Sequence, residues 1–361
     1  MKNLKIFAYF IVLLLISLCG LHRFASGGSG ITKETYLWPE TKPFHSGYLQ
    51  VSDIHQIYYE VSGNPQGKPI FFLHGGPGGS STPRMRQWAN PKKYMIILHD
   101  QRGAGKSKPF CEIRENTTQN LVADIERLRK KLKVNQIILA GGSWGTTLAL
   151  AYAETYPQNV AGMILHRVFT ATKSEIDHIF HGGVSLFFPE VYQNFLNAIP
   201  DPDTQSLPAC LYRLLYKGDK KTQHRVANAW GRYTLRISLL KISEKKVEKL
   251  LNSYDPFPNA LFESYYMSHS AFLEEGQLLS NAHKIAHIPA VIINGRYDLI
   301  CPLKNAYKLH QALPRSKLVI VEGAGHSGME PGLEKALVEA ITLFEYQGRW
   351  VKTSKYVRFS Y

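Results

Sequence analysis

Short runs of apolar residues recur along the chain and are typical of strands buried on both faces of a sheet. Six such runs cover residues 70–73, 95–98, 137–140, 163–165, 290–293 and 318–321. Ahead of them, residues 48–60 alternate apolar and polar positions, which predicts a β-hairpin around Asp53.

Helical periodicity separates several of these runs. Leu121, Ile125, Leu128 and Leu132 recur at helical spacing, with charged residues on the opposite face, which predicts a helix over 121–132. Strands that alternate with helices predict an α/β fold with a mostly parallel, doubly wound sheet. Residues 170–286 break this alternation, because they are rich in aromatic side chains and lack buried-strand runs. We therefore expect an inserted helical cap domain there.

The first 30 residues have the layout of a targeting segment. Lys2 and Lys5 precede an apolar run over 6–18, and small residues follow at 25–30. This order is typical of a secretory signal peptide. An N-terminal membrane anchor through residues 6–21 stays open, although a membrane span needs about 20 apolar residues. We expect a periplasmic, extracellular or membrane-anchored protein, with a cytoplasmic location as the alternative.

These patterns predict four segments. They are a signal peptide or anchor with its linker (1–30), the first part of an α/β core (31–169), a helical cap (170–286), and the second part of the core with a basic C-terminal tail (287–361).

The composition of the chain argues against nucleic acid as a partner and against a disulfide or zinc framework. The formal net charge is +15, from 43 Lys and Arg against 28 Asp and Glu. The basic residues are scattered and accompany no nucleic-acid-binding motif, so we expect a solvated basic surface and no nucleic acid. The four cysteines lie far apart, which excludes a disulfide scaffold and a zinc site of usual spacing. We expect free thiols, and a bridge among Cys111, Cys210 and Cys301 stays open for an exported chain.

A candidate nucleophile lies in the segment Gly141-Gly142-Ser143-Trp144-Gly145, a G-x-S-x-G match. An apolar strand precedes the segment and a helical pattern follows it. Strand, sharp turn and helix form the nucleophile elbow of the α/β-hydrolase fold, in which small residues permit the strained backbone that exposes the serine hydroxyl. The sequence therefore predicts that Ser143 is a nucleophile.

A serine nucleophile needs a base, and the base needs an orienting acid. In this fold the acid and then the histidine follow the serine, on loops after later strands. Asp298 follows the apolar run 290–293, and His326 follows the run 318–321 through a Gly-Ala-Gly approach. We predict a triad of Ser143, Asp298 and His326.

The oxyanion hole is expected from backbone N–H groups after the first parallel strand and after the nucleophile. The glycine-rich segment 74–79 directly follows the apolar run 70–73. No Gly-Lys-Ser/Thr follows it, so a phosphate loop is disfavoured. We assign the donors to Gly76 and Trp144.

Together these segments resemble the proline iminopeptidase (prolyl aminopeptidase) family of α/β-hydrolase serine peptidases. The resemblance runs from about residue 48 to 344, and its strongest pieces are HGGPGG from His74, DQRGAGKS from Asp100, NTTQNLVADIERLR from Asn116, GGSWGTTLALAYAETYP from Gly141, GRYDLICP from Gly295 and AGHSGMEPG from Ala324. It implies a serine aminopeptidase that releases an N-terminal residue, preferentially proline, from small peptides with a free N-terminus. The resemblance also implies a reaction through an acyl-enzyme, without metal or cofactor.

The family binds the substrate amine with glutamates of the cap. Phe262-Glu263-Ser264 resembles one such segment, which makes Glu263 the candidate amine anchor. Thr234 stands where the family's second glutamate closes a W-S-x-W-E stretch, and Gly182 stands where an acidic residue is common. These departures keep a related esterase or amidase with altered acyl specificity as the alternative. The sequence does not indicate an oligomeric state.

Overall fold

A nine-stranded sheet forms the centre of the computed structural model, which describes residues 36–330, 332–347 and 356–359. The strands are β1 (His45–Gln50), β2 (Gln56–Gly63), β3 (Lys68–Leu73), β4 (Tyr94–His99), β5 (Ile137–Ser143), β6 (Val160–Val168), β7 (Ala290–Gly295), β8 (Ser316–Val321) and β9 (Tyr356–Phe359). All six apolar runs lie within strands of this sheet. The expected signal peptide or anchor, residues 1–30, lies outside the described residues.

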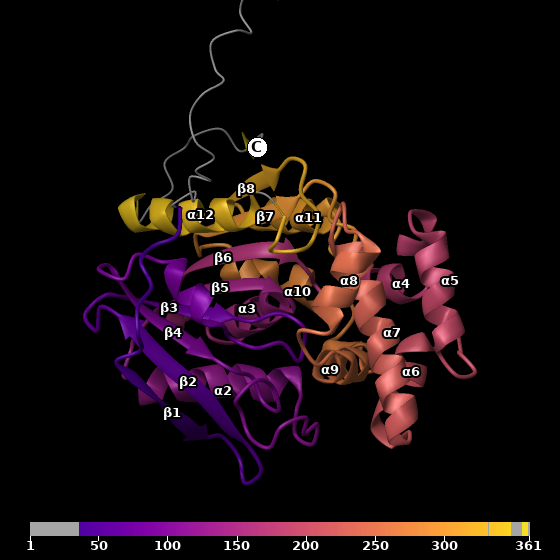
Figure 1. Cartoon of the computed structure of the whole chain (residues 1–361). Coiled ribbons are helices and arrows are strands. Elements are labelled where there is room, and N and C mark those ends of the chain that lie inside the picture. Colours follow the sequence, from indigo (N-terminus) through magenta and orange to yellow (C-terminus); the bar gives the residue numbers. More distant parts are fainter. Residues whose placement is uncertain (1–35, 331, 348–355, 360–361) are drawn as a thin grey trace, which may run out of the picture. The chain divides into compact units, whose positions relative to one another are not determined.

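The sheet is mostly parallel, with strand order β1-β2-β4-β3-β5-β6-β7-β8-β9 (Figure 1). The pairs β1–β2 and β2–β4 are antiparallel, and the pairs from β4–β3 to β8–β9 are parallel. The predicted hairpin is present, because β1 and β2 pair with Gln50 opposite Gln56. Strand β9 lies in the segment that the sequence indicated only as a basic tail.

Alternate side chains of the central strands enter two separate hydrophobic cores, as the two-residue period of a strand requires. In β3, Phe71 and Leu73 pack into one core, whereas Ile70 and Phe72 pack into the other. The first core also contains side chains of α2 (Thr118–Lys131), α3 (Trp144–Thr155) and α11 (Leu303–Ala312). The second contains side chains of α12 (Leu333–Gln347). Helices therefore cover both faces, which makes this a doubly wound α/β fold.

The helix predicted over 121–132 is α2. Its apolar residues Leu121, Ile125 and Leu128 are buried, and its N-terminus is capped by Thr117, whose hydroxyl accepts a hydrogen bond from the Asn120 N–H. A threonine cap of this kind satisfies one of the free N–H groups of the first turn.

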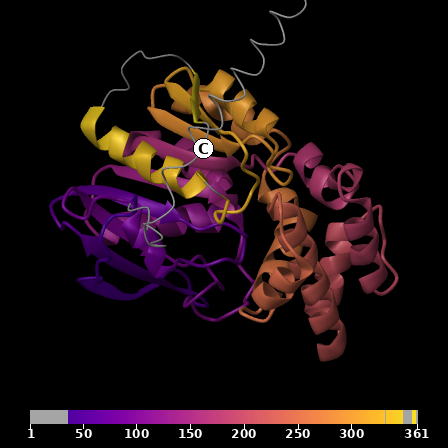
Figure 2. The ribbon, with the colours of Figure 1, turned by 45° about the horizontal axis from the view of Figure 1, so that its top comes forward.

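Between β6 and β7 the chain forms helices and no strand. The α-helices are α4 (Lys173–Phe180), α5 (Pro189–Ala198), α6 (Leu207–Lys217), α7 (Lys220–Ser238), α8 (Glu244–Leu251), α9 (Phe257–Ser268) and α10 (Gln277–Ser280). The 3-10 turns are η3 (Val184–Leu186), η4 (Ser270–Phe272) and η5 (Asn281–Ile285), and two more, η1 (Pro83–Gln87) and η2 (Pro157–Asn159), precede this region. Helices α4 to α9 lie together on one side of the sheet in both views (Figures 1 and 2). None of the helices in the described ranges is long and apolar enough to cross a membrane.

Candidate active site

Ser143 lies at the junction of β5 and α3. It is the last residue of the strand and the N-cap of the helix, with φ 56° and ψ −124°. A positive φ is uncommon for a residue with a side chain, and such strain is typical of functional turns. The turn is the nucleophile elbow that the sequence predicts.

Three glycines make this turn sterically feasible, because any Cβ at their positions would collide with a neighbour. A Cβ on Gly141 would lie 2.2 Å from the carbonyl oxygen of Gly145, and one on Gly145 would lie 2.2 Å from that of Leu73. A Cβ on Gly142 would lie 2.0 Å from the ring of His166. The small residues around the serine are therefore required by close packing of strand against helix.

Asp298 and His326 meet on the loops after β7 and β8. His326 Nδ1 lies 3.0 Å from Asp298 Oδ1 and 2.9 Å from Oδ2. The carboxylate also accepts hydrogen bonds from the backbone N–H groups of Ile300 and Cys301, at 3.0 and 2.7 Å. Both Asp298 and His326 are buried. Because Nδ1 faces the carboxylate, Nε2 is the nitrogen left for a reaction partner.

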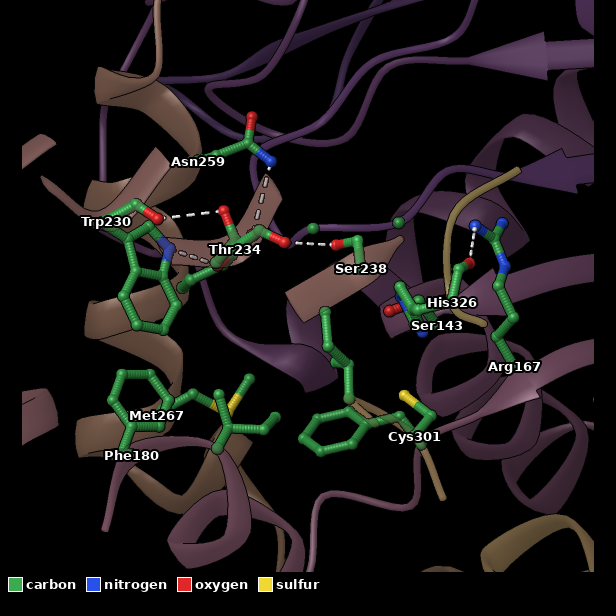
Figure 3. Close-up of a pocket in the computed structure, with 16 residues that line it drawn as sticks. Ser143, Arg167, Phe180, Trp230, Thr234, Ser238, Asn259, Met267, Cys301 and His326 are labelled. Atoms are coloured by element: carbon green, nitrogen blue, oxygen red, sulfur yellow. Dashed lines mark hydrogen bonds between the residues drawn. The ribbon is translucent and has the colours of Figure 1, made fainter. Parts of the chain in front are cut away.

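One cavity of about 320 Å³ joins these residues to the helices inserted between β6 and β7 (Figure 3). Residues of the α/β core that line it are Gly75, Gly76, Ser143, Arg167, Phe169, Ile300, Cys301 and His326. The other lining residues are Ile179, Phe180, Trp230, Thr234, Ser238, Asn259, Glu263 and Met267. The cavity therefore brings Ser143, His326, Gly76 and Glu263 together, although they come from four separate parts of the sequence.

Besides the Ser143 hydroxyl, the thiol of Cys301 in the α/β core is a potential nucleophile that lines this cavity. Burial raises the pKa of the Cys301 thiol well above its usual range, and the nearby Asp298 charge acts in the same direction. A thiol that stays protonated is a poor nucleophile. Of the two, Ser143 is therefore the better candidate.

The glycine-rich loop after β3 passes directly beside Ser143. Gly75 lies so close that a Cβ there would be 3.5 Å from the Ser143 Cβ. Gly76 has φ +113°, a conformation that favours glycine, and it lines the cavity. Trp144 is the first residue of α3, where backbone N–H groups have no partner within the helix. Of the two predicted oxyanion donors, Trp144 directly follows the serine, and Gly76 lines the same cavity.

Gln101 connects the two segments that carry these donors. Its side-chain Nε2 donates to the carbonyl of His74 at 2.9 Å, and its Oε1 accepts from the indole Nε1 of Trp144 at 2.9 Å. Its backbone N–H also donates to His74 Nε2 at 3.0 Å, and burial lowers the pKa of that imidazole, which keeps it neutral. The buried Gln101 therefore fixes the glycine-rich loop against the start of α3.

Glu263 lies on α9 at the far wall of the cavity. The indole Nε1 of Trp230 on α7 donates to its Oε2 at 2.6 Å, and the Asn259 side chain donates to its Oε1 at 3.4 Å. Burial raises the pKa of Glu263 to about 7, and these two hydrogen bonds act against that rise. A bound cation would stabilise the ionised form of this carboxylate, because the cation offsets the hydration that the carboxylate has lost.

The two departures from the family pattern lie in different places. Thr234 lines the cavity, and its hydroxyl donates to carbonyls of its own helix, those of Trp230 at 3.0 Å and Gly231 at 3.2 Å. Gly182 follows α4 with φ +113° and is not among the lining residues. Only Thr234 therefore bears on the cavity itself.

Sequence reasoning missed three residues of this region. Asn259 and Arg167 line the cavity, and Gln101 braces the oxyanion loop. Gln101 belongs to the segment DQRGAGKS from Asp100, which the sequence indicates is a structural loop that braces the site, without singling out this residue. Asn259 precedes Glu263 by one helical turn, a spacing that places the two on one face of α9 and that could have identified it.

Comparison with known proteins gives consistent results. A family model described as "alpha/beta hydrolase fold" matches residues 68–333. A "Probable proline iminopeptidase" of Leptolyngbya boryana is 44% identical over 314 residues, covering 86% of this chain and 97% of that protein. A "Proline iminopeptidase" of Arabidopsis thaliana is 41% identical, covering 86% and 82% respectively. Among solved structures, the esterase EaEST from Exiguobacterium antarcticum superposes with a TM-score of 0.56 at 21% identity, covering 83% of this chain and 99% of that one, which indicates a shared fold alone.

Proposed function

The chain belongs to the proline iminopeptidases of the α/β-hydrolase family, and from this premise we propose that it releases an N-terminal residue, preferentially proline, from small peptides. The observation that carries the proposal is one cavity with Ser143 and His326 at one wall and the partly buried carboxylate of Glu263 at another. The first pair supports acyl transfer, and the carboxylate supports recognition of a free amine.

In the acylation step, Ser143 Oγ attacks the carbonyl carbon of the N-terminal residue while His326 Nε2 accepts the hydroxyl proton. Asp298, at 2.9 Å from Nδ1, holds the ring and stabilises its protonated form. The negative charge that develops on the carbonyl oxygen is stabilised by the N–H groups of Gly76 and Trp144. The carbon–nitrogen bond then breaks, and His326 returns its proton to the leaving amine.

The second half of the cycle hydrolyses the acyl-enzyme. A water molecule gives a proton to His326 Nε2 and attacks the ester carbonyl. The new oxyanion occupies the same hole, and its collapse releases the free amino acid and restores the Ser143 hydroxyl. All groups used in this cycle belong to the chain or to water.

Glu263 is the proposed partner of the substrate's ammonium group, which is a secondary ammonium when the N-terminal residue is proline. A partly buried carboxylate whose two hydrogen-bond donors, Trp230 and Asn259, are both neutral retains lone pairs for a cation. A charge-assisted hydrogen bond is roughly twice as strong as a neutral one. The aromatic rings of Phe180 and Trp230, stacked with centroids 4.8 Å apart, form an apolar wall of the same cavity. A small apolar ring such as proline suits this wall.

Hydrolysis of proline 2-naphthylamide by the purified protein tests the proposal, alongside the N-acetylated naphthylamide and a simple ester. We expect the free amine substrate to be hydrolysed far faster than its N-acetylated counterpart. Hydrolysis of the ester without hydrolysis of the free amine substrate would instead support an esterase of altered acyl specificity, which the loss of a carboxylate at Thr234 motivates.

We further propose, from the sequence pattern, that residues 1–30 direct export or hold the chain at a membrane. Cell fractionation, combined with mass spectrometry of the mature N-terminus, tests this. Cleavage near the small residues 25–30 would indicate a signal peptide, and an intact chain in the membrane fraction would indicate an anchor. An intact chain in the cytosolic fraction would contradict both.

A further inference from the structure

Arg167 occupies an irregular position in β6, directly beside the elbow. In the β5–β6 pairing, Gly142 lies opposite His166 and Ser143 lies opposite Val168, so Arg167 is an extra residue in the ladder. Its φ is 58°, which is uncommon for a side chain of this size. Bulges of this kind are frequent beside active sites, where they redirect a side chain. Here the bulge directs the arginine into the cavity of Ser143.

The hydrogen bonds of the guanidinium leave part of it unused. Nε donates to His166 Nδ1 at 3.1 Å, and Nη1 donates to the backbone carbonyl of His326 at 3.2 Å. Within the described ranges, Nη2 has no hydrogen-bond partner, and no carboxylate lies within 4.0 Å of the group. Burial lowers the pKa of Arg167, an effect that the Asp298 charge opposes. Arg167 is a partly buried cation without an ion-pair partner, which is costly, so an anionic ligand would stabilise it.

Arg167 lies on the side of the serine opposite to the amine anchor. In Figure 3, Trp230 and Asn259, which hydrogen-bond Glu263, lie to one side of Ser143 and His326, and Arg167 lies to the other. The cavity is therefore anionic at one end and cationic at the other, with the nucleophile between them. His326, whose carbonyl Arg167 contacts, is also the group that protonates the leaving amine. The cation thus borders the path of the leaving residue.

We propose that Arg167 binds the free α-carboxylate of the leaving residue, so that the preferred substrates are dipeptides with both termini free. This inference rests on the proposed function, because it assumes that Glu263 holds the substrate amine. A free dipeptide carries an ammonium and a carboxylate on opposite sides of its single peptide bond, which matches the two charged ends of the cavity. Arginine is suited to this role, since its planar donors fit a carboxylate in two parallel hydrogen bonds.

A pair of substrates that differ only in the terminal charge tests the inference. We would measure kcat/KM for prolylglycine and for prolylglycine amide, which replaces the carboxylate with a neutral group of similar size. The wild type should prefer the free dipeptide by about tenfold, the factor expected from one charge-assisted contact. Arg167→Gln, which keeps a donor for the His326 carbonyl but removes the charge, should bring the ratio close to one. Arg167→Lys should give an intermediate ratio.

Arg315→Gln is the matched control. Arg315 is an exposed arginine that also donates to a backbone carbonyl, that of His287, and it lies outside the cavity. Its replacement should leave the substrate ratio at the wild-type value.

Two results would overturn the inference, and both can be told apart from failure of the proposed function. A wild-type ratio near one would show that the carboxylate is not recognised. An equal loss on both substrates in Arg167→Gln would show that Arg167 only positions the His326 loop. In either case the wild type still hydrolyses proline 2-naphthylamide, whereas failure of the proposed function would abolish that hydrolysis as well.

Discussion

The two walls of the cavity are built in different ways. At the wall of Ser143, the residues of the predicted triad and oxyanion hole follow the ends of β3, β5, β7 and β8, and much of the geometry comes from backbone atoms. At the wall of Glu263, the helices α4, α7 and α9 line the cavity. The carboxylate there accepts hydrogen bonds from the side chains of Trp230 and Asn259. A preorganised backbone suits chemistry that is common to many hydrolases. Side chains on helices can change singly, which suits the selection of substrate.

The two walls are nevertheless connected through the end of α7. The carbonyl of Ser238 accepts hydrogen bonds from the N–H groups of His326 and Ser327, at 3.0 and 2.9 Å. The helix that carries Trp230 and Thr234 therefore also holds the loop of the proposed base. A shift of α7 would move the His326 loop and so change activity on every substrate. The effect of a substitution at the Glu263 wall on amine binding therefore has to be measured as a difference between amine and non-amine substrates.

The largest effect is expected from Ser143→Ala, which removes the proposed nucleophile. Activity on proline 2-naphthylamide should fall by about 10,000-fold or more, because removing the serine of a triad leaves only the contribution of the oxyanion hole and binding. A fluorophosphonate probe should label the wild type at Ser143 and should not label the variant. Ser253→Ala, at an exposed serine, is the control. Activity within a hundredfold of the wild type in Ser143→Ala would rule out the assigned nucleophile.

Glu263→Gln should have the next largest effect, confined mainly to amine substrates. We expect kcat/KM on proline 2-naphthylamide to fall about 100-fold, corresponding to roughly 3 kcal/mol for a buried charge pair. An uncharged ester should lose much less, because it makes no contact through an ammonium group. Glu190→Gln, at an exposed glutamate of α5, serves as the matched control. Equal losses on amine and ester would mean that Glu263 acts through the position of α7.

The contrast between the two walls also explains what the sequence could predict. Ser143 lies in a contiguous motif between a strand and a helix, and Asp298 and His326 follow apolar runs, so local patterns were enough to propose them as a triad. The contact between Trp230 and Glu263 joins residues 33 positions apart on different helices, and no local pattern indicates how two helices cross.

Two other features depended on tertiary structure. Arg167 enters the cavity because of a bulge and a positive φ, and β6 reads in sequence as an ordinary apolar run. Strand β9 lies in a short segment with basic residues, and it pairs only at the edge of the sheet, next to β8. An edge strand lacks the continuous apolar signal of a strand buried on both faces.

Thr234→Glu should improve binding of the substrate's ammonium group at the Glu263 wall. It adds a second carboxylate to the cavity that holds Glu263, and a bound ammonium would then be shared by two negative charges. Like charges raise each other's pKa, so the gain should be greatest at about pH 8, where both groups ionise more fully. We expect kcat/KM on proline 2-naphthylamide to rise several-fold, about 1 kcal/mol. Thr234→Gln, similar in size but uncharged, should show no rise, and an equal rise in both variants would exclude an electrostatic cause.

The smallest effect should be on stability, and it follows from the pKa of Glu263. Burial raises that pKa from 4.5 to about 7, so the folded protein retains a proton that the unfolded chain releases. The resulting stabilisation is complete below pH 4.5 and is lost as the pH rises through 7. Glu263→Gln does not titrate, so its melting temperature should exceed that of the wild type by about 2–3 °C at pH 8.5, with a smaller difference at pH 5.5.

Glu154→Gln provides the matched comparison for this stability effect. Burial likewise raises the pKa of Glu154 to about 7, but this residue lies on α3 and does not line the cavity. Its replacement should reproduce the pH-dependent gain in melting temperature without changing KM for proline 2-naphthylamide. Thermal unfolding followed by circular dichroism at the two pH values measures both variants. If only Glu154→Gln showed the gain, Glu263 would already be ionised without cost, and the proposed amine site would carry no penalty in stability.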